Sequence, residues 1–282
     1  MRQIAPGIHV ETTYRRVNVA AIETDEGFIL IDTPTYPTDV RDWQEKLSTI
    51  ADLPVLYIVN TDHHRDRILG HQWFDAPVIA HRAAADEMLA LSQTFVTAAA
   101  EEIAADDNEL VELAGVRLVP PHISYETAMT IKKGGRDVTL THVPGATAGS
   151  TWIEFPEEKV IFVGDHIVTN THPFMADSVS KAWLDALTWL RRGRFDGYKV
   201  VPGRGGVTKA ENSHVVSDYV RTARRRVQGL YRSGRPRADT VSLVEGLLPQ
   251  FPIRNGDRDE ILRRIRAGLE HIYDEHKTGG DE

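Results

Sequence analysis

A short polar cluster at residues 62–67 is the densest group of side chains in this sequence that could do chemistry. It reads Asp-His-His-Arg-Asp-Arg and directly follows an apolar run at 55–59 that predicts a buried strand. In open α/β sheets, ligands bind beyond the carboxyl ends of the strands, which is where this cluster begins. Carboxylates beside a histidine suit acid–base catalysis or metal binding, so we expect the active pocket here.

The composition removes several kinds of site. The 282 residues include no cysteine, which excludes disulfides, thiolate zinc sites, iron–sulfur clusters and cysteine nucleophiles. Histidine and carboxylate side chains must therefore carry any metal chemistry. The 33 Lys and Arg residues against 41 Asp and Glu residues give a net charge of -8, which opposes binding to a phosphate backbone. We expect a small-molecule substrate and no nucleic-acid partner.

The apolar segments predict neither export nor membrane insertion. Residues 1–7 contain no apolar run followed by a small-residue cleavage site, and no stretch approaches the length of a membrane-spanning helix. We therefore expect a cytoplasmic protein without a membrane partner. A single core serves chains up to about 250–300 residues, so the length predicts one large domain with an appendage.

Strands and helices alternate in the first 208 residues. Strand-like runs at 17–22 and 28–31 flank a turn, a helix is expected from Thr38, and further strands are expected at 55–59 and 78–80. A helical stretch at 83–105 precedes strands predicted at 116–119, 128–132, 137–143, 151–155 and 159–163. Two β-rich halves predict an α/β fold with a sheet-on-sheet core and helices outside.

Residues 209–282 have helical periodicity instead. Apolar stripes begin at Val216, Val241 and Ile261, and each predicts an amphipathic helix. We expect these helices to form a C-terminal extension of the domain at 1–208. The extension either covers one end of the core or forms a homodimer contact, and the sequence leaves both open.

Five segments in this order resemble the motifs of the metallo-β-lactamase-fold hydrolases. They are Asn18 with the Gly27 to Thr33 segment, the polar cluster at 62–67, the Pro144 to Ser150 segment, Val163-Gly164-Asp165, and the Val201 to Gly205 segment. The resemblance covers roughly residues 4–208 and implies an αββα sandwich. Relatives hold two metal ions, usually zinc, at the loop ends, where a bridging hydroxide attacks an ester, thioester, lactone or amide.

Position by position, the resemblance implies that most metal ligands are replaced. His64, Asp66 and Asp165 match the family's ligands, and Asp62 stands where a histidine is expected. At three further positions where the family has a histidine ligand, this sequence has Arg67, Ala146 and Arg204. Guanidinium groups stay protonated and cannot ligate a metal. A +2 ion some 4 Å from a +1 charge suffers about 8 kcal/mol of repulsion at an effective dielectric of about 20, so we expect no standard two-metal centre.

The two replacement arginines have two possible roles. Arg67 and Arg204 can neutralise Asp66 and Asp165 as a structural substitute for the ions. They can also bind a carboxylate or phosphate on the substrate, or stabilise an oxyanion. The two roles are compatible, and the sequence does not choose between them.

The remaining polar residues complete a hypothesis for the catalytic site. We expect His64 to act as a general base whose pKa is raised by Asp62 or Asp66, with Asp165 in the same acid–base group. His166 and His172 lie near motif loops and are expected to contact the substrate.

Three functions follow from these residues. The leading hypothesis is a hydrolase-like or lyase-like enzyme with a metal-poor or metal-free pocket, which acts on a small anionic molecule by acid–base chemistry. The second is a hydrolase that keeps one zinc, iron or manganese ion on Asp62, His64 and a recruited His142, His166 or Asp165. The third is a binding protein that has kept the fold and lost the chemistry.

Overall fold

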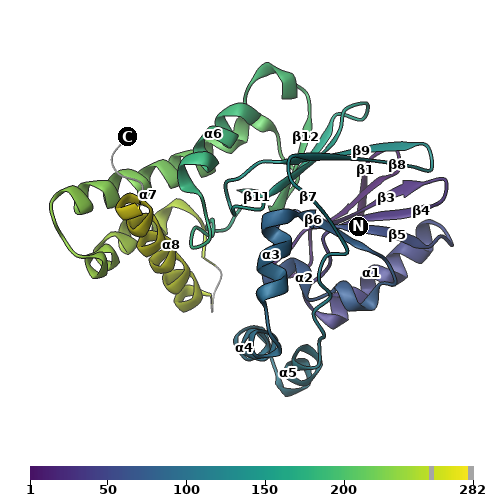
Figure 1. Ribbon diagram of the computed structural model, residues 1–282, viewed down its shortest axis with the longest axis horizontal. Coiled ribbons are helices and arrows are strands. Elements are labelled where there is room, and N and C mark those ends of the chain that lie inside the picture. Colours follow the sequence, from purple (N-terminus) through teal and green to yellow (C-terminus); the bar gives the residue numbers. More distant parts are fainter. Residues whose placement is uncertain (254–256, 279–282) are drawn as a thin grey trace.

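Two β-sheets lie face to face in the computed structural model, which describes residues 1–253 and 257–278 (Figure 1). The first sheet contains, in spatial order, β1 (Arg2–Ala5), β2 (Ile8–Glu11), β3 (Val19–Thr24), β4 (Gly27–Ile31), β5 (Val55–Val59), β6 (Val78–His81) and β7 (Ile123–Tyr125). The second contains β12 (Lys199–Arg204), β11 (Val160–Val168), β10 (Thr151–Phe155), β9 (Arg136–His142) and β8 (Ala128–Lys133).

Helices alternate with the strands along the chain. The first half contains α1 (Pro37–Ile50), α2 (Arg65–Ile68), η1 (His71–Trp73), α3 (Arg82–Ala90), α4 (Gln93–Ile103) and α5 (Asp107–Ala114). The second half contains α6 (Ser180–Leu190), η2 (Gly193–Phe195), η3 (Ala210–Ser213), α7 (His214–Arg232), η4 (Arg237–Gly246), η5 (Leu248–Gln250) and α8 (Arg258–Thr278). In Figure 1, α4 and α5 project away from the sheets, and α7 and α8 lie at the opposite side from β3 and β4.

Separate apolar clusters hold the layers together. Side chains from both sheets, such as Ile29 and Phe162, meet in the central layer. Trp43 on α1 packs on the outer face of the first sheet, and Trp183 on α6 packs with apolar residues of the second. Each fully buried apolar side chain contributes roughly 1.5–3 kcal/mol to folding. The predicted αββα sandwich is thus confirmed.

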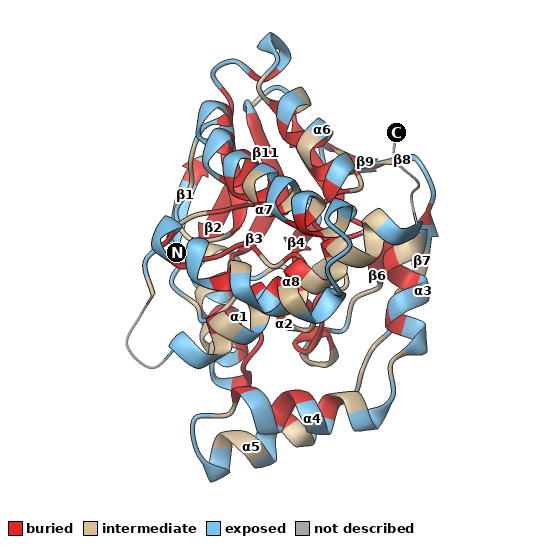
Figure 2. Cartoon of the chain, turned by 90° about the vertical axis from the view of Figure 1, so that its left-hand side faces the viewer, coloured by how far each residue is buried: buried red, intermediate tan, exposed pale blue. Residues whose placement is uncertain are grey.

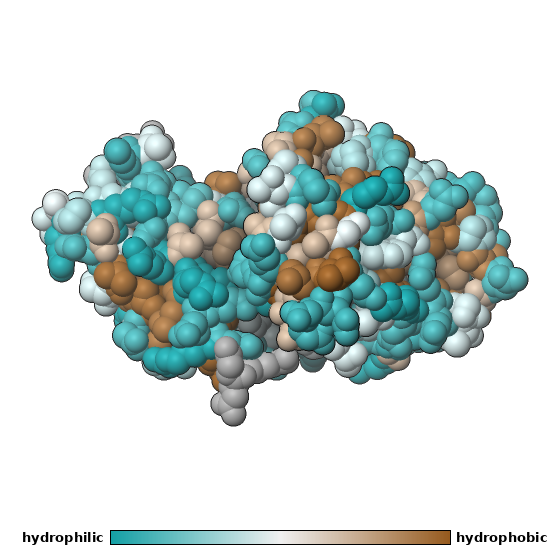
Figure 3. All heavy atoms as spheres, turned by 90° about the horizontal axis from the view of Figure 1, so that it is seen from below, coloured by the Kyte–Doolittle hydropathy of each residue, from teal (hydrophilic) through white to brown (hydrophobic). Residues whose placement is uncertain are grey.

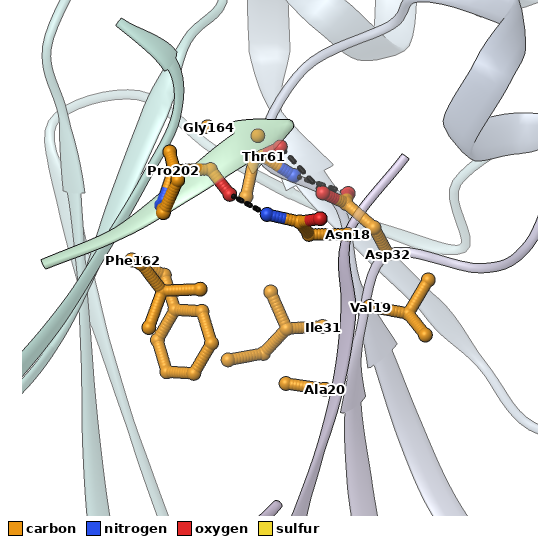
Figure 4. Close-up of a pocket in the computed structure, with 11 residues that line it drawn as sticks. Asn18, Val19, Ala20, Ile31, Asp32, Thr61, Phe162, Gly164 and Pro202 are labelled. Atoms are coloured by element: carbon orange, nitrogen blue, oxygen red, sulfur yellow. Dashed lines mark hydrogen bonds between the residues drawn. The ribbon is translucent and has the colours of Figure 1, made fainter. Parts of the chain in front are cut away.

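The parallel strands bring the polar segments to one edge of the sandwich. β4, β5 and β6 run parallel, as do β11 and β12, so the segments that follow them converge. The sheets are joined there by a hydrogen bond from the Asn18 amide to the Gly203 carbonyl, 2.9 Å, and another from Thr151 to Thr61, 2.8 Å. Figure 4 shows the Asn18 side chain extending to Pro202, and Thr61 facing Asp32.

Below these polar groups lies a small cavity of about 10 Å³, lined by Ile31 and Phe162 among others (Figure 4). Such a volume admits about one water molecule. The sheets therefore close tightly beneath the polar edge, and a substrate cannot enter between them.

Three predicted segments differ from the structure. The run at 116–119 is not a strand, because Val116 packs among α4 and α5, and the edge strand β7 begins only after Pro120 and Pro121. The helical stretch at 83–105 divides into α3 and α4, since Leu91 and Ser92 have extended backbones. The stripe beginning at Val241 lies in 3-10 turns of η4 and η5 rather than in an α-helix.

The C-terminal helices share the apolar cluster of the second sheet. Tyr219 and Val220 on α7 and Ile265 and Leu269 on α8 lie in the same cluster as Trp183. Figure 2 shows α7 and α8 lying across the strands at one end of the sandwich. The helices therefore cover one end of the core, and the boundary at 208/209 stays a prediction.

The surface seen from below has two lobes separated by a notch, with hydrophobic residues in several separate patches (Figure 3). Among the helices of residues 1–253 and 257–278, none combines the length and apolar character needed to span a membrane.

Candidate active site

Arg67 lies at the centre of a buried ion cluster. Its side chain, on the short helix α2, is 0% exposed, and Nη2 donates to Oδ1 of Asp165 at 2.6 Å. Nε lies 3.2 Å from Oδ2 of Asp32 and 3.5 Å from Oδ1 of Asp62, and it donates to the Thr61 hydroxyl at 2.8 Å. The carboxylates and the hydroxyl around the guanidinium thus compensate its loss of water.

Arg204, at the end of β12, binds the other side of the same carboxylate. Its Nη2 lies 2.8 Å from Oδ2 of Asp66 and 3.3 Å from Oδ2 of Asp165. Gly203 permits this close approach, since a Cβ there would lie 2.1 Å from Oδ1 of Asp165 and 2.3 Å from Nη2 of Arg67. Both oxygens of Asp165 therefore face guanidinium groups.

The arginines determine the charge state of the acids. Burial by itself would raise the pKa of Asp165, but Arg204 and Arg67 hold it well below its ordinary value. In the same way, Arg204 lowers the pKa of the buried Asp66, and Arg67 and His64 lower that of Asp62.

Asp32 differs from these three carboxylates. Burial, with the charge of Asp62 adding to it, raises the pKa of Asp32 to about 6 despite the neighbouring Arg67. Asp32 has a left-handed backbone, φ 54°, and accepts hydrogen bonds from the Thr61 amide at 2.9 Å and the Thr61 hydroxyl at 2.6 Å. In the sequence Asp32 stands out only as part of the motif segment from Gly27 to Thr33, whereas in the structure it is a member of the ion cluster.

His64 joins this cluster to a cavity. Nδ1 lies 3.3 Å from Oδ1 of Asp62 and 3.3 Å from Oδ2 of Asp165, and Nε2 lies 3.6 Å from Oδ2 of Asp177. Burial opposes protonation, but these three carboxylates raise the pKa of His64 well above its ordinary value. Asp66, the other expected partner, is not among these contacts. An imidazolium cannot accept a proton, so the raised pKa favours a general acid over the predicted general base.

The cavity beside His64 has a volume of about 380 Å³. It is lined by Arg16, His63, His64, Arg65, Asp66, Glu87, Leu91, Phe95, Glu102, Phe174, Asp177, Arg204, Glu260 and Arg264. These residues come from α2, α3, α4 and α8, from the end of β12, and from loops. We call it the pocket.

Much of this pocket wall is formed by residues that no sequence motif marks. Arg16, Phe174 and Asp177 lie in loops, and Glu260 and Arg264 lie on α8. Helical periodicity marks the polar face of α8, but nothing in the sequence shows that this face meets the polar edge of the sheets.

The sequence model of the metallo-beta-lactamase superfamily matches residues 12–226. The chain belongs to this superfamily. The match ends within α7, so the pocket residues contributed by α8 lie outside it.

Three solved structures resemble the chain in fold. A metallo-beta-lactamase from Pontibacter korlensis is 20% identical, with a TM-score of 0.61, 78% of this chain covered and 97% of that chain. A metallo-beta-lactamase family protein from Thermus thermophilus is 15% identical, with a TM-score of 0.68 and coverages of 97% and 95%. A stereoselective inverting sec-alkylsulfatase from a Pseudomonas species is 14% identical, with a TM-score of 0.70, and 99% of this chain spans 50% of its length.

The superfamily's metal ions do not fit these residues. The donor atoms of Asp62, His64 and Asp165 lie within 4.8 Å of one another, as one ion would require. However, Arg67 and Arg204 contact both oxygens of Asp165, and a cation there would have to displace them or bear their repulsion. Ala146, at the position of another family ligand, is 0% exposed and has no donor atom.

The other predicted histidines do not line the pocket. His166 is 0% exposed beside Trp152 and Trp183, and burial lowers its pKa to about 4. His172 contacts Tyr219 and Phe251, and burial lowers its pKa to about 4 as well. The structure therefore does not bring His166 or His172 to the place where we predicted substrate contact, because each ring turns into an aromatic core.

His142 has different neighbours too. Its ring stacks on His81 with centroids 3.6 Å apart, and its Nε2 lies 2.8 Å from the Ala148 carbonyl. His142 is thus not grouped with Asp62 and His64 as a recruited metal ligand.

Proposed function

We propose that this protein is an enzyme of the metallo-beta-lactamase superfamily that works without a metal centre and acts on a small anionic substrate by acid–base chemistry. The observation that carries the proposal is the pair of arginines on Asp165. Their positive charges neutralise carboxylates that would otherwise attract cations, with Arg67 2.6 Å and Arg204 3.3 Å from that carboxylate.

His64 is the proposed catalytic residue. Asp62 and Asp165 hold its imidazolium on the Nδ1 side, and Nε2 lies on the side of Asp177, an exposed acid of the pocket wall. From there Nε2 donates a proton to the leaving group as the bond between that group and the substrate breaks. The imidazolium is restored by the proton that the attacking water loses in hydrolysis, or that the neighbouring carbon loses in elimination. Without a metal to lower the pKa of water, such a site suits elimination or the hydrolysis of an already activated substrate.

Activity measurements before and after chelation test the proposal. The full chain, purified without affinity-tag metal, would be assayed on activated esters, lactones, sulfate esters and acids with a β-leaving group, and its metal content measured. We expect less than one equivalent of metal, turnover that chelator does not change, and a loss of about 100-fold or more in His64→Gln. The control His214→Gln changes an exposed histidine on α7 and should keep full activity.

Each alternative has its own result. Turnover that vanishes with chelator and returns with zinc, iron or manganese would establish the mononuclear metal enzyme instead. A protein that binds anions but turns over no substrate of any class would be a binding protein. In that case His64→Gln should bind anions as the parent protein does and should also show no turnover.

A further inference from the structure

We infer that Arg264 anchors an oxyanion whose apolar body lies against Phe174, so that helix α8 completes the substrate pocket. The inference rests on the proposed function, because it assigns the substrate class of the same pocket. It makes α8 a determinant of specificity.

Arg264 is a pocket cation with no close acidic partner. Its nearest carboxylate oxygen among the ion pairs is Oε1 of Glu260, 3.9 Å from Nη1. Glu260 already holds Arg16 through two hydrogen bonds of 2.9 and 3.1 Å. The Arg264 side chain is only 18% exposed, and within the described parts of the chain it makes no hydrogen bond. A guanidinium that has lost most of its water gains strongly from an added oxyanion.

The other arginines of the pocket are already paired. Arg65 lies 2.5 Å from Glu102, Arg204 lies 2.8 Å from Asp66, and Arg16 is held by Glu260 as above. Binding an anion to any of these would weaken an existing ion pair. Arg264 requires no such exchange.

The environment of Arg264 supports this role. Burial, with the nearby charge of Arg204, lowers its pKa to about 10, so the group remains charged at neutral pH while its charge is poorly compensated. Glu87 and Asp177, the other acids of the pocket wall, are exposed to solvent, which screens them.

Phe174 supplies the apolar part of the site. Its ring is half-buried and makes an edge contact with His64, centroids 5.4 Å apart. The Arg264 guanidinium lies 5.3 Å from the centre of the same ring. Leu91 and Phe95 of the α3–α4 segment are also half-buried in the pocket wall. A ligand anchored on Arg264 thus has an apolar surface beside the proposed proton donor.

The position of Arg264 depends on a contact between the two ends of the chain. Glu260 precedes Arg264 by about one helical turn, and its two bonds to Arg16 hold the start of α8 over the pocket. Arg16 has a left-handed backbone, φ 73°, and its Nε donates to the Tyr36 hydroxyl at 2.9 Å. Arg16 and Glu260 are therefore positioning residues for Arg264. Figure 2 shows α8 lying in front of α2, which carries Arg67.

Titration with defined anions tests the inference. Binding of octanoate, octyl sulfate, octanol and inorganic phosphate to the full chain would be measured by calorimetry. We expect at least one of the two octyl anions to bind ten-fold or more tightly than both octanol and phosphate, and the two anions distinguish a carboxylate from a sulfate. Equal affinity for octanol, or phosphate binding as tightly as the octyl anions, would overturn the inference.

A matched pair of variants identifies the residue. Arg264→Met should weaken binding of the preferred octyl anion ten-fold or more, and Arg264→Lys should recover part of the loss. Arg263→Met removes the same charge from the exposed neighbouring position on α8 and should stay within two-fold of the parent. Unchanged affinity in Arg264→Met, with a parental circular dichroism spectrum, would refute the anchor.

The same titrations in His64→Gln separate this inference from the proposed function. Retained anion binding with lost turnover supports both. A parent protein that binds octyl anions through Arg264 and never turns over a substrate rejects only the function. Metal-free turnover that depends on His64, with binding indifferent to Arg264→Met, rejects only the anchor.

Discussion

Arg67 and Arg264 are both arginines within the same site, yet their surroundings differ in kind. Arg67 is 0% exposed and faces Asp165, Asp32 and Asp62 at 2.6 to 3.5 Å. Arg264 is 18% exposed, and its nearest ion-pair partner is 3.9 Å away. A buried arginine near a pocket is thus a structural element when carboxylates already surround its guanidinium group. It is a candidate ligand-binding group when no carboxylate lies close to it.

Removing Arg67 is the strongest way to test this contrast. Arg67→Met leaves three buried carboxylates without their shared cation, so we expect the free energy of unfolding to fall by about 3–5 kcal/mol. Arg264→Met breaks no close ion pair and should cost less than about 1 kcal/mol. Urea unfolding measures both. Similar losses for the two variants would show that the distinction is wrong.

The His64→Gln variant separates the role of the ion cluster in turnover from the role of the pocket in anion binding. His64→Gln should reduce turnover by about 100-fold or more, because the proton donor is lost. Affinity for the octyl anions should change less than three-fold, since the anchor lies on α8. Steady-state kinetics measures the turnover, and calorimetry on the same preparation measures the affinity for the octyl anions. A variant that loses binding and turnover together would place His64 in anion binding instead.

The pH dependence sharpens the assignment of His64 as an acid. Burial opposes protonation of His64, but the neighbouring carboxylates raise its pKa well above 6.5, so turnover should be retained above pH 6.5 and fall only as the pH rises through the raised pKa. The stability that protonated His64 contributes is complete below the unfolded pKa of 6.5 and is lost as the pH rises through the raised pKa of the folded state. Unfolding free energies of parent and His64→Gln should therefore converge as the pH rises. A difference that grows with pH would contradict the assignment.

The smallest effect concerns the contact that positions α8. Glu260→Gln weakens the bidentate pair with Arg16, and we expect the affinity for octyl anions to drop about two- to five-fold with less than about 1 kcal/mol lost in stability. Arg41→Gln, which disrupts the exposed pair with Glu112, is the control and should alter neither quantity. Affinity equal to the parent in Glu260→Gln would remove Glu260 from the positioning role.

The architecture and the centre of the site can be predicted from the amino-acid sequence. Apolar runs at β4 and β11 are buried strands, and the run at β5 is a strand whose last two residues are buried. The motif segments following them meet because parallel strands end at a common edge. The replacement of metal-binding positions by Arg67 and Arg204 is also visible in the sequence, since guanidinium groups cannot be ligands.

Which side chains share the site depends on how the chain packs in three dimensions. His166 follows Asp165 directly, yet its ring packs against tryptophans, because neighbouring residues on a strand face opposite sides of a sheet. Arg264 lies about two hundred residues from Arg67, and the helical pattern of α8 shows which face is polar without showing what that face meets. Whether an arginine is paired depends on atoms brought together by packing, and spacing along the chain does not contain that information.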